Sequence, residues 1–399
     1  MMRVINSNKL LLGIGKLTDT KTKVYQIGLL FALMITMKEV LALSYNNFQI
    51  FSFGSIDFWA GINPYSDWNH LSLLGKPLDR FLYGPLFSIL FTPFTVLPGK
   101  IGVVCWNVFT YTLFYFAVFT LPDEFTLIKK KFVFFYTALI LFSTLLSMQF
   151  NPVVAAIFLF SFTLLEKKQG FWAVLLIFLS GFIKVYGIFQ IVMILFYPGF
   201  WKNILYALLI GITFIFLPLI HLPITQLDNY YLSWIVMLMN HLDVSRFYSI
   251  YRPVSLFINS ITPFTGYITL GVLFMVLFFT IFRLKQFKES LLYRAHFLGI
   301  IMSWAILFSI GSERHTYVIA MIGYVIWYLC SSPKRLDRAL LWINFILLVI
   351  LPIDILCPVA ISDFVLGKLN LGIIIFTITW FIMVFKTFIS PSVYYYKKP

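Results

Sequence analysis

Long apolar stretches, separated by short polar segments, make up almost the whole chain. A helix of about 20 mostly apolar residues is long enough to cross a lipid bilayer. Twelve stretches reach or approach this length: 25–44, 101–121, 131–147, 149–166, 170–183, 186–198, 203–222, 266–284, 292–310, 316–331, 339–356 and 369–389. Apolar residues occupy 61% of the 399 positions and charged residues only 11%, and a water-soluble fold could not bury so much hydrocarbon. The sequence therefore excludes a soluble enzyme, a nucleic-acid-binding protein and a disordered scaffold. It predicts an all-α polytopic membrane protein with about 12 transmembrane helices.

A thirteenth apolar stretch, 82–98, is interrupted by glycine and proline residues. Its path across the membrane is decided by charge, because basic residues gather in cytoplasmic loops. If 82–98 does not cross, the outer side carries only eight of the 30 Lys and Arg residues: Lys76, Arg80, Lys100, Lys184, Arg246, Arg252, Arg314 and Lys368. If it did cross, every later loop would change sides and this asymmetry would be lost. We therefore expect 82–98 to form a re-entrant or interfacial helix and both termini to be cytoplasmic.

This topology divides the chain into three parts. Residues 1–24 form a cytoplasmic N-terminal segment, 25–389 the transmembrane domain of a multi-pass protein of the cell (inner) membrane, and 390–399 a cytoplasmic tail. Two outer loops are long, 45–100 and 223–265. The three cysteines lie far apart without the spacing of a metal site, so we expect neither a metal nor another cofactor.

Three carboxylates, Asp57, Asp67 and Asp79, lie in the first outer loop. The Asn63-Pro64 pair predicts a turn that carries Tyr65 and Asp67. An enzyme that removes a proton from a sugar hydroxyl needs a carboxylate within hydrogen-bonding distance of that hydroxyl. The simpler interpretation is that these acids are ordinary residues of a hydrated loop.

Lys184 interrupts an otherwise apolar run from 170 to 198. A cation in such surroundings is unfavourable unless it lines a cavity or meets an anion. The predicted topology places Lys184 at the outer end of a helix, at the depth of a lipid-linked phosphate. The alternative is a lysine whose side chain extends so that its ammonium group lies in the water at the membrane interface, without binding a phosphate.

Two further polar segments are predicted on the outer face. The Glu313-Arg314-His315-Thr316 segment offers a guanidinium and an imidazole that can bind phosphate oxygens, or it is a plain turn with a surface ion pair. Gln149 and Asn151 lie in a tight turn, where they can bind sugar or headgroup hydroxyls or cap a helix.

These segments, in this order, resemble the GT-C superfamily of membrane glycosyltransferases, and within it glycosyltransferase family 87, which includes polyprenol-phosphate-mannose-dependent mannosyltransferases. The resemblance spans about residues 40–330 and rests on six segments: Gly61-Ile62-Asn63-Pro64-Tyr65, Tyr83-Gly84-Pro85-Leu86-Phe87, Trp106-Asn107, Gln149-Phe150-Asn151, Ile183-Lys184-Val185-Tyr186 and Glu313-Arg314-His315-Thr316.

The resemblance implies inverting transfer of mannose or another hexose or pentose at the outer face of the membrane, without a metal. The donor would be a polyprenyl-phosphate-linked sugar and the acceptor a lipid-linked or extracytoplasmic glycan; membrane lipid would be a partner and nucleic acid would not. By analogy, the catalytic base would be one of three acids: Asp79, Asp67 or Asp57. The donor phosphate would be held by Lys184, Arg314 and His315. The substrates would be bound by Tyr65, Tyr83, Gln149, Asn151 and Asn47.

One position departs from the family pattern. The family's Asp usually precedes the Phe just after the first helix, and here that place holds Asn47. An amide cannot act as a general base, so either the role has moved to Asp79, Asp67 or Asp57, or the chain no longer catalyses. Asp79 is our first choice because it closely precedes the Tyr83-Gly84-Pro85 helix start. Two alternatives remain open: a transporter or flippase of lipid-linked saccharides, or a catalytically inactive relative that assists a partner enzyme.

Overall fold

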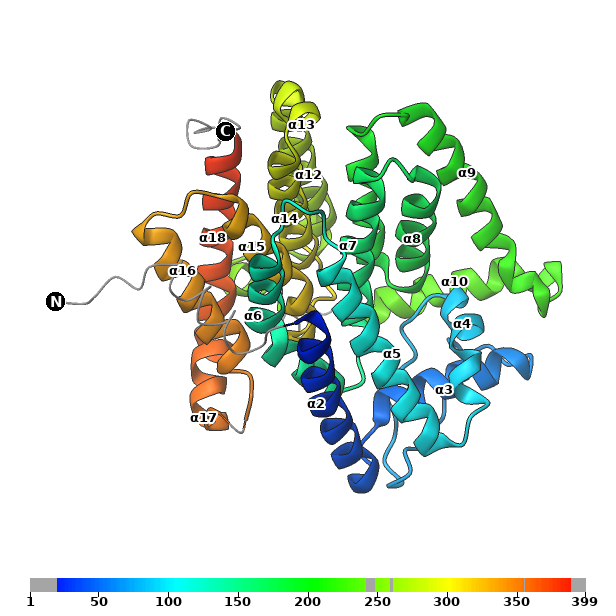
Figure 1. Cartoon of the computed structure of the whole chain (residues 1–399). Coiled ribbons are helices and arrows are strands. Elements are labelled where there is room, and N and C mark those ends of the chain that lie inside the picture. The colour runs from blue at the N-terminus through cyan, green and yellow to red at the C-terminus, as the bar shows by residue number, and fades with distance from the viewer. Residues whose placement is uncertain (1–19, 242–247, 259–260, 355, 389–399) are drawn as a thin grey trace.

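The computed structural model describes residues 20–241, 248–258, 261–354 and 356–388, and within these ranges the chain forms helices and no strands (Figure 1). The longer α-helices are α2 (Lys21–Ala42), α3 (Asn46–Trp59), α4 (Pro85–Thr95), α5 (Gly99–Phe119), α6 (Leu127–Leu146), α7 (Asn151–Glu166), α8 (Gly170–Ile183), α9 (Phe200–Phe216), α10 (Ile224–His241), α12 (Thr265–Phe282), α14 (Leu291–Leu307), α15 (Tyr317–Cys330), α16 (Arg335–Phe345) and α18 (Leu371–Phe388). The shorter α-helices are α11 (Tyr251–Ser255), α13 (Leu284–Glu289) and α17 (Val359–Ser362). Four 3₁₀ helices and two π-helices complete the fold: η1 (Val185–Leu195), η2 (Leu217–Ile220), η3 (Thr262–Phe264), η4 (Arg314–Thr316), η5 (Ile346–Ile350) and η6 (Asp363–Lys368).

Five helices in the described ranges are long and apolar enough to cross a membrane: Lys21–Ala42, Gly99–Phe119, Phe200–Ile220, Thr262–Phe282 and Leu371–Phe388. Other expected spans form shorter apolar helices, among them α7, α8, η1 and α14. In a helix the internal backbone N–H and C=O groups hydrogen-bond to one another, so they need no water in the hydrocarbon core of a membrane. The helical membrane class is confirmed, and the number of 12 crossings stays a prediction.

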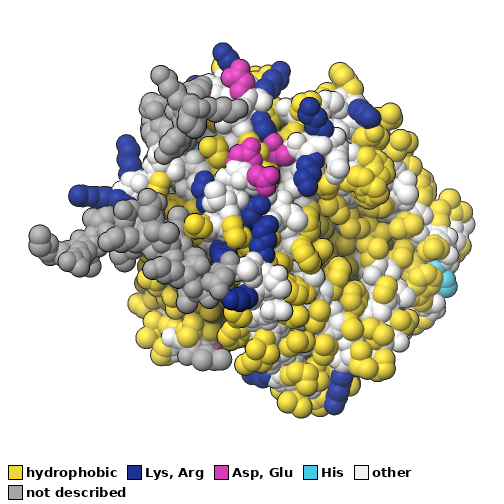
Figure 2. Space-filling view, in the orientation of Figure 1, with side chains coloured by type: hydrophobic (Ala, Val, Ile, Leu, Met, Phe, Trp, Pro, Cys, Tyr) yellow, Lys and Arg dark blue, Asp and Glu magenta, His cyan; other side chains and the backbone are white. Residues whose placement is uncertain are grey.

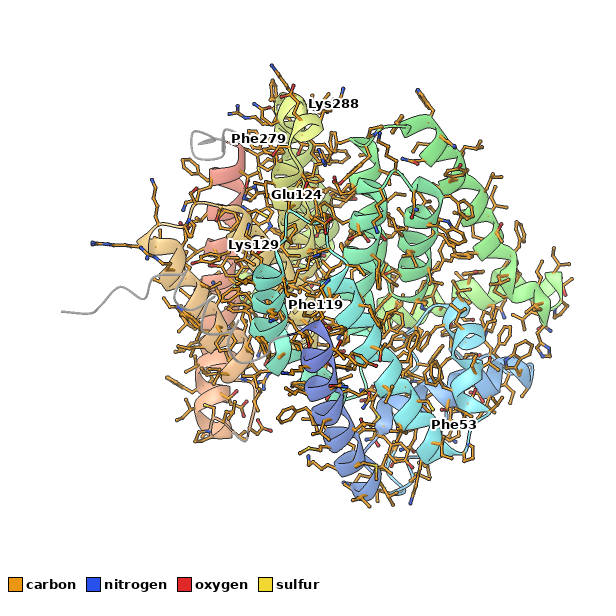
Figure 3. All side chains as sticks on the ribbon, viewed as in Figure 1. Phe53, Phe119, Glu124, Lys129, Phe279 and Lys288 are labelled. Carbon is orange, nitrogen blue, oxygen red and sulfur yellow. The ribbon has the colours of Figure 1, made fainter. Side chains whose placement is uncertain are left out.

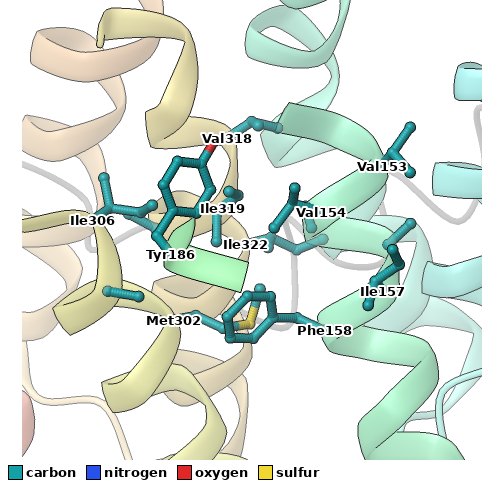
Figure 4. Close-up of a cluster of buried hydrophobic side chains, with 14 of the residues drawn as sticks. Val153, Val154, Ile157, Phe158, Tyr186, Met302, Ile306, Val318, Ile319 and Ile322 are labelled. Atoms are coloured by element: carbon teal, nitrogen blue, oxygen red, sulfur yellow. The ribbon is translucent and has the colours of Figure 1, made fainter. Parts of the chain in front are cut away.

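The core of the bundle is the pair α14 and α15, with α7 packed against both. Gly299 and Gly323 let α14 and α15 touch, since a Cβ on Gly299 would lie 2.5 Å from the carbonyl oxygen of Gly323. Figure 4 shows buried side chains of the three helices, together with Tyr186 of η1, in one hydrophobic cluster: Val153, Val154, Ile157, Phe158, Met302, Ile306, Val318, Ile319 and Ile322. This packing holds the first turn of α7 in place.

The two long outer loops contain helices, and of these the apolar pattern predicted only the one within 82–98. The first holds α3 and α4, and Pro85 at the start of α4 is preorganised for a helix because its fixed φ suits the first turn. The second holds α10, which lies across the direction of α8 and α9 (Figure 1). The stretch expected at 82–98 is therefore helical, and its re-entrant position in the membrane stays a prediction.

The expected span at 186–198 is a 3₁₀ helix, η1, that folds back on α8. Two glycines allow this close return. A Cβ on Gly187 would lie 2.0 Å from the Ser180 hydroxyl oxygen, and one on Gly181 would lie 2.7 Å from Cβ of Ile188. The hairpin that results places Lys184 at its tip.

The face seen in Figure 2 is largely apolar, with charged side chains gathered mainly in its upper and central parts. Lys288, in the last turn of α13, stands at the upper tip of the molecule, and Phe53 of α3 lies at the lower end (Figure 3). This separation agrees with α3 and α13 facing opposite sides of a membrane.

Cysteine labelling tests the predicted sidedness. In a background with Cys105, Cys330 and Cys357 replaced by alanine, we expect Ser66→Cys to react with a membrane-impermeant maleimide in intact cells. Ser332→Cys should react only after the membrane is opened, since the charge pattern puts it on the cytoplasmic side. Labelling of both positions from the same side would overturn the predicted topology.

Candidate functional site

Polar side chains from separate segments of the chain meet where α7 begins. They come from the start of α3, the approach to α4, the α6–α7 turn, the α8–η1 hairpin and η4. We call this set the Lys184 cluster, and its members are Asn47, Tyr83, Ser147, Gln149, Asn151, Lys184, Tyr186, Glu313 and His315.

Lys184 lies between α8 and η1 with an extended backbone, at φ −138° and ψ 114°. Its Nζ donates a 2.8 Å hydrogen bond to Oδ1 of Asn151. The same Nζ lies 5.2 Å from the ring centre of Tyr83 and 5.4 Å from that of Tyr186, within the range of a cation–π interaction. The ammonium group is therefore surrounded by aromatic faces and one amide oxygen.

The α6–α7 turn supplies two amides. Asn151, in the first turn of α7, is fully buried, and its Oδ1 accepts from Lys184 and from the Tyr186 hydroxyl. Its Nδ2 lies 3.5 Å from Oε1 of Gln149, whose Nε2 lies 3.4 Å from Oε2 of Glu313. One chain of polar contacts thus joins the hairpin tip to η4.

Glu313 supplies the one carboxylate of the cluster. It caps η4, where its backbone N–H donates to the Thr316 hydroxyl at 2.9 Å. Burial lowers the pKa of Lys184 to about 8, and the Glu313 charge opposes this shift. Lys184 is therefore mostly protonated at neutral pH, and a bound anion would raise its pKa.

His315 and Asn47 close the other side of the cluster. The Ser147 hydroxyl lies 3.1 Å from Nε2 of His315, and Nδ2 of Asn47 donates a 2.6 Å hydrogen bond to the Ser147 carbonyl. Burial lowers the pKa of His315 below its ordinary value, with Glu313 opposing the shift, so the imidazole is neutral at pH 7. The position at which the family usually carries an Asp therefore does reach the cluster, here with an amide.

Arg314 lies outside the cluster, although the sequence groups it with its neighbours. Its Nε donates to the Tyr248 hydroxyl, and its Nη2 lies 3.4 Å from Oδ1 of Asp363. Arg252 stacks on the same Tyr248 ring at 5.0 Å. Successive residues of a 3₁₀ helix point in directions about a third of a turn apart, so His315 and Arg314 face different neighbours.

The three acids of the first loop have different surroundings, and none contacts the cluster among the described residues. Asp57 is buried, and its Oδ2 lies 2.7 Å from Nε2 of His70. Asp67 is exposed and accepts from the Ser66 hydroxyl at 3.1 Å. Asp79 is exposed, and its side chain forms no hydrogen bond or ion pair within the described ranges.

The buried Tyr65 supports the cluster from the first loop, because its hydroxyl donates a 2.8 Å hydrogen bond to the Tyr83 carbonyl. Sequence reasoning did not single out Glu313 as a functional carboxylate. The available signal was its position beside His315 in a polar segment between two apolar helices.

Gly84 ties the approach to α4 to the hairpin. Its N–H donates a 3.0 Å hydrogen bond to the Ile183 carbonyl, and a Cβ here would lie 2.0 Å from the Phe182 carbonyl oxygen. A proline has no N–H and would bring ring atoms into this contact. This explains why glycine replaces the first proline of the resembled Tyr-Pro-Pro-Leu-Phe motif.

The fold and the site together define a helical membrane protein with a half-buried, cation-centred polar site at one end of its bundle. A family model for glycosyltransferase family 87 matches residues 81–309, more than half of the chain. This chain belongs to glycosyltransferase family 87, a family of membrane glycosyltransferases. Comparison with curated proteins finds no match. The matched range includes Tyr83, Gln149, Asn151 and Lys184, and it ends just before Glu313.

Proposed function

We propose that this protein transfers a hexose or pentose, such as mannose, from a polyprenyl phosphate to a lipid-linked or extracytoplasmic glycan at the outer face of the cell membrane. The observation that carries the proposal is the placement of Lys184. The ammonium group of Lys184 lies at a hairpin tip, beside two tyrosine rings, a buried asparagine and a neutral histidine. Such a site suits a phosphate attached to a lipid.

The chemistry follows from the charge that develops during transfer. The acceptor oxygen attacks the anomeric carbon from the side opposite the phosphate, the carbon–oxygen bond to the phosphate breaks, and the configuration inverts. The leaving polyprenyl phosphate gains one negative charge, which Lys184 offsets while His315 donates a hydrogen bond. Preorganised donors of this kind act most strongly on charge that appears in the transition state. The proposed reaction uses neither a metal nor another cofactor.

The acceptor proton must pass to a base. We keep Asp79 as the proposed base, with Asp67 and Asp57 as alternatives, because Asp79 precedes the Tyr83-Gly84 approach to the cluster and is accessible to an incoming acceptor. Glu313 is a second candidate, favoured by its contact with Gln149 and its charge interaction with Lys184.

The remaining residues have proposed binding roles. Tyr83, Gln149 and Asn151 would contact the donor sugar or its phosphate, Tyr65 would support Tyr83, and Asn47 would contact the acceptor. Arg314, which faces Tyr248 and Asp363, would reach a donor phosphate only after leaving these partners.

A catalytically inactive partner protein is the second candidate function, and Asn47 is the observation that favours it. The deciding experiment is an assay of the purified protein with a panel of polyprenyl-phosphate sugars and glycan acceptors. Product formed with inversion supports the proposed transfer. Donor binding without turnover across the panel would support the inactive partner.

Donor binding should weaken as the pH rises through about 8. Below this value Lys184 is protonated and attracts the donor phosphodiester, whose charge is constant over the range; above it the free site loses its cation. We expect the dissociation constant, measured by equilibrium binding from pH 6.5 to 9.5, to be flat at first and then to rise about tenfold per pH unit. Lys184→Arg retains its charge and should remove this dependence, whereas a flat profile in the wild type would contradict the role of Lys184.

A further inference from the structure

A second polar cavity lies at the opposite end of α7 from the Lys184 cluster. It has a volume of about 440 Å³ and opens between the α7–α8 turn and the start of α9. The 16 residues of α7 separate it from Asn151 by about 24 Å. The connection from η1 to α9 lies at the same end of the molecule as α13 (Figure 1). The cavity is therefore distinct from the candidate active site and faces the other side of the bundle.

Two lysines, Lys168 and Lys202, line this cavity. Neither forms an ion pair with a carboxylate among the residues that the structure describes. The neighbouring acid, Glu166, is held by Arg294 through contacts of 2.6 Å and 2.7 Å, so its charge is already neutralised. The cavity consequently has an uncompensated positive charge.

Two helices begin at the cavity without a side-chain cap. Gln169 precedes α8 and Gly199 precedes α9, and neither start is closed by a side-chain hydrogen bond. The free N–H groups of a helix start and its dipole both favour an anion. Asn203 lines the same cavity, is only 4% exposed, and forms no side-chain hydrogen bond within the described ranges. Its amide atoms are not among the fully buried, unpartnered polar atoms, so they keep access to the cavity, where a polar ligand can hydrogen-bond to them.

The rim of the cavity is aromatic. Nζ of Lys202 lies 5.7 Å from the ring centre of Tyr206. Trp172 lines the cavity and is 56% exposed. Trp201, which directly precedes Lys202 in the sequence, is 80% exposed. Tryptophan and tyrosine concentrate where hydrocarbon meets lipid headgroups. The ligand is therefore expected to combine an anionic group with an adjoining apolar part.

We propose that this cavity binds the headgroup of an anionic phospholipid, in the leaflet opposite the Lys184 cluster. Its phosphodiester accepts hydrogen bonds from Lys168, Lys202 and Asn203 and lies on the two helix starts, while its acyl chains run along the apolar surface beside Trp172. Basic pockets between membrane helices are suited to such headgroups. The site is independent of the proposed sugar transfer, since none of its residues belongs to the Lys184 cluster.

Lipid binding to the purified full-length protein tests this site. Wild type should bind phosphatidylglycerol in preference to phosphatidylcholine, measured by native mass spectrometry. Combining Lys168→Gly with Lys202→Ala should weaken phosphatidylglycerol binding about 25-fold, from about fivefold for each lysine. Lys168 has a left-handed backbone, at φ 58°, where glycine is favoured, so this substitution should not impair folding.

Lys167→Ala is the matched control, because it removes the adjacent lysine without altering the cavity lining. Asn203→Leu keeps both charges and should weaken binding severalfold; its elution profile and melting temperature report whether it folds. Unchanged phosphatidylglycerol binding in the double variant would overturn the proposal. Equal weakening in Lys167→Ala would do so as well, since it would indicate a diffuse basic surface. Displacement of the lipid by inorganic phosphate would assign the cavity to a soluble phosphate compound instead.

Discussion

Replacement of Lys184 by alanine is expected to lower transfer from a polyprenyl-phosphate sugar by about 100- to 1,000-fold, the range for loss of a preorganised donor to developing charge. The cluster has no second cation to replace it, because Arg314 is bonded to Tyr248 and faces away. Folding should be retained, since Oδ1 of Asn151 still accepts from Tyr186. Turnover of a labelled donor by purified protein measures the effect.

Lys76→Ala is the control for this substitution, since Lys76 is an exposed lysine of the first outer loop with no side-chain contact to the cluster. It should retain wild-type turnover. Full activity of Lys184→Ala, with a normal melting temperature, would remove the phosphate site from the proposed mechanism.

Replacement of Asp79 by asparagine is expected to lower kcat at least about 100-fold, the lower range for loss of a general base. Asparagine has almost the same shape, and Asp79 is exposed, so stability should be unchanged. Asp67→Asn is the matched comparison, because Asp67 is an exposed acid of the same loop. A large loss for Asp67→Asn or Asp57→Asn, with Asp79→Asn active, would show that another first-loop acid is the base.

Glu313→Gln separates the two candidate carboxylates by its pH profile. Since the Glu313 charge raises the pKa of Lys184, its removal should lower that pKa below about 8 and move the alkaline loss of activity to lower pH. Activity at pH 6.5 should be largely retained. Loss of kcat at every pH, together with an active Asp79→Asn variant, would identify Glu313 as the base.

The membrane class and helical fold were predictable because they depend on local composition. A run of apolar residues must form helices in a bilayer whatever its neighbours are. The helices α3 and α10 of the two long loops were not predicted, because polar residues interrupt their apolar stretches. These two segments are helical because they pack on the surface of the bundle. The hydrophobic pattern of a single segment does not reveal such packing.

The sequence could predict which segments contribute to the candidate site. It could not predict the direction in which each side chain of those segments points. Lys184 is hydrogen-bonded to Asn151, and His315 lies beside Ser147 of the neighbouring turn, while the roles of these residues stay predictions. Arg314 does not join them, because its direction depends on the 3₁₀ geometry of η4 and on Tyr248. Glu313 was overlooked as a functional carboxylate because its contact with Gln149 exists only in three dimensions.

The link between Gly84 and Ile183 has a thermodynamic consequence for how two substrates would bind. The Tyr83-Gly84 segment, which a proposed acceptor would approach, is hydrogen-bonded through the Gly84 N–H to the α8–η1 hairpin that carries Lys184. No Cβ separates the two segments at this point. A shift of the segment at Gly84 is therefore expected to shift the hairpin as well. Occupancy by either substrate is expected to change the affinity for its co-substrate by the same factor, since coupling free energies are reciprocal.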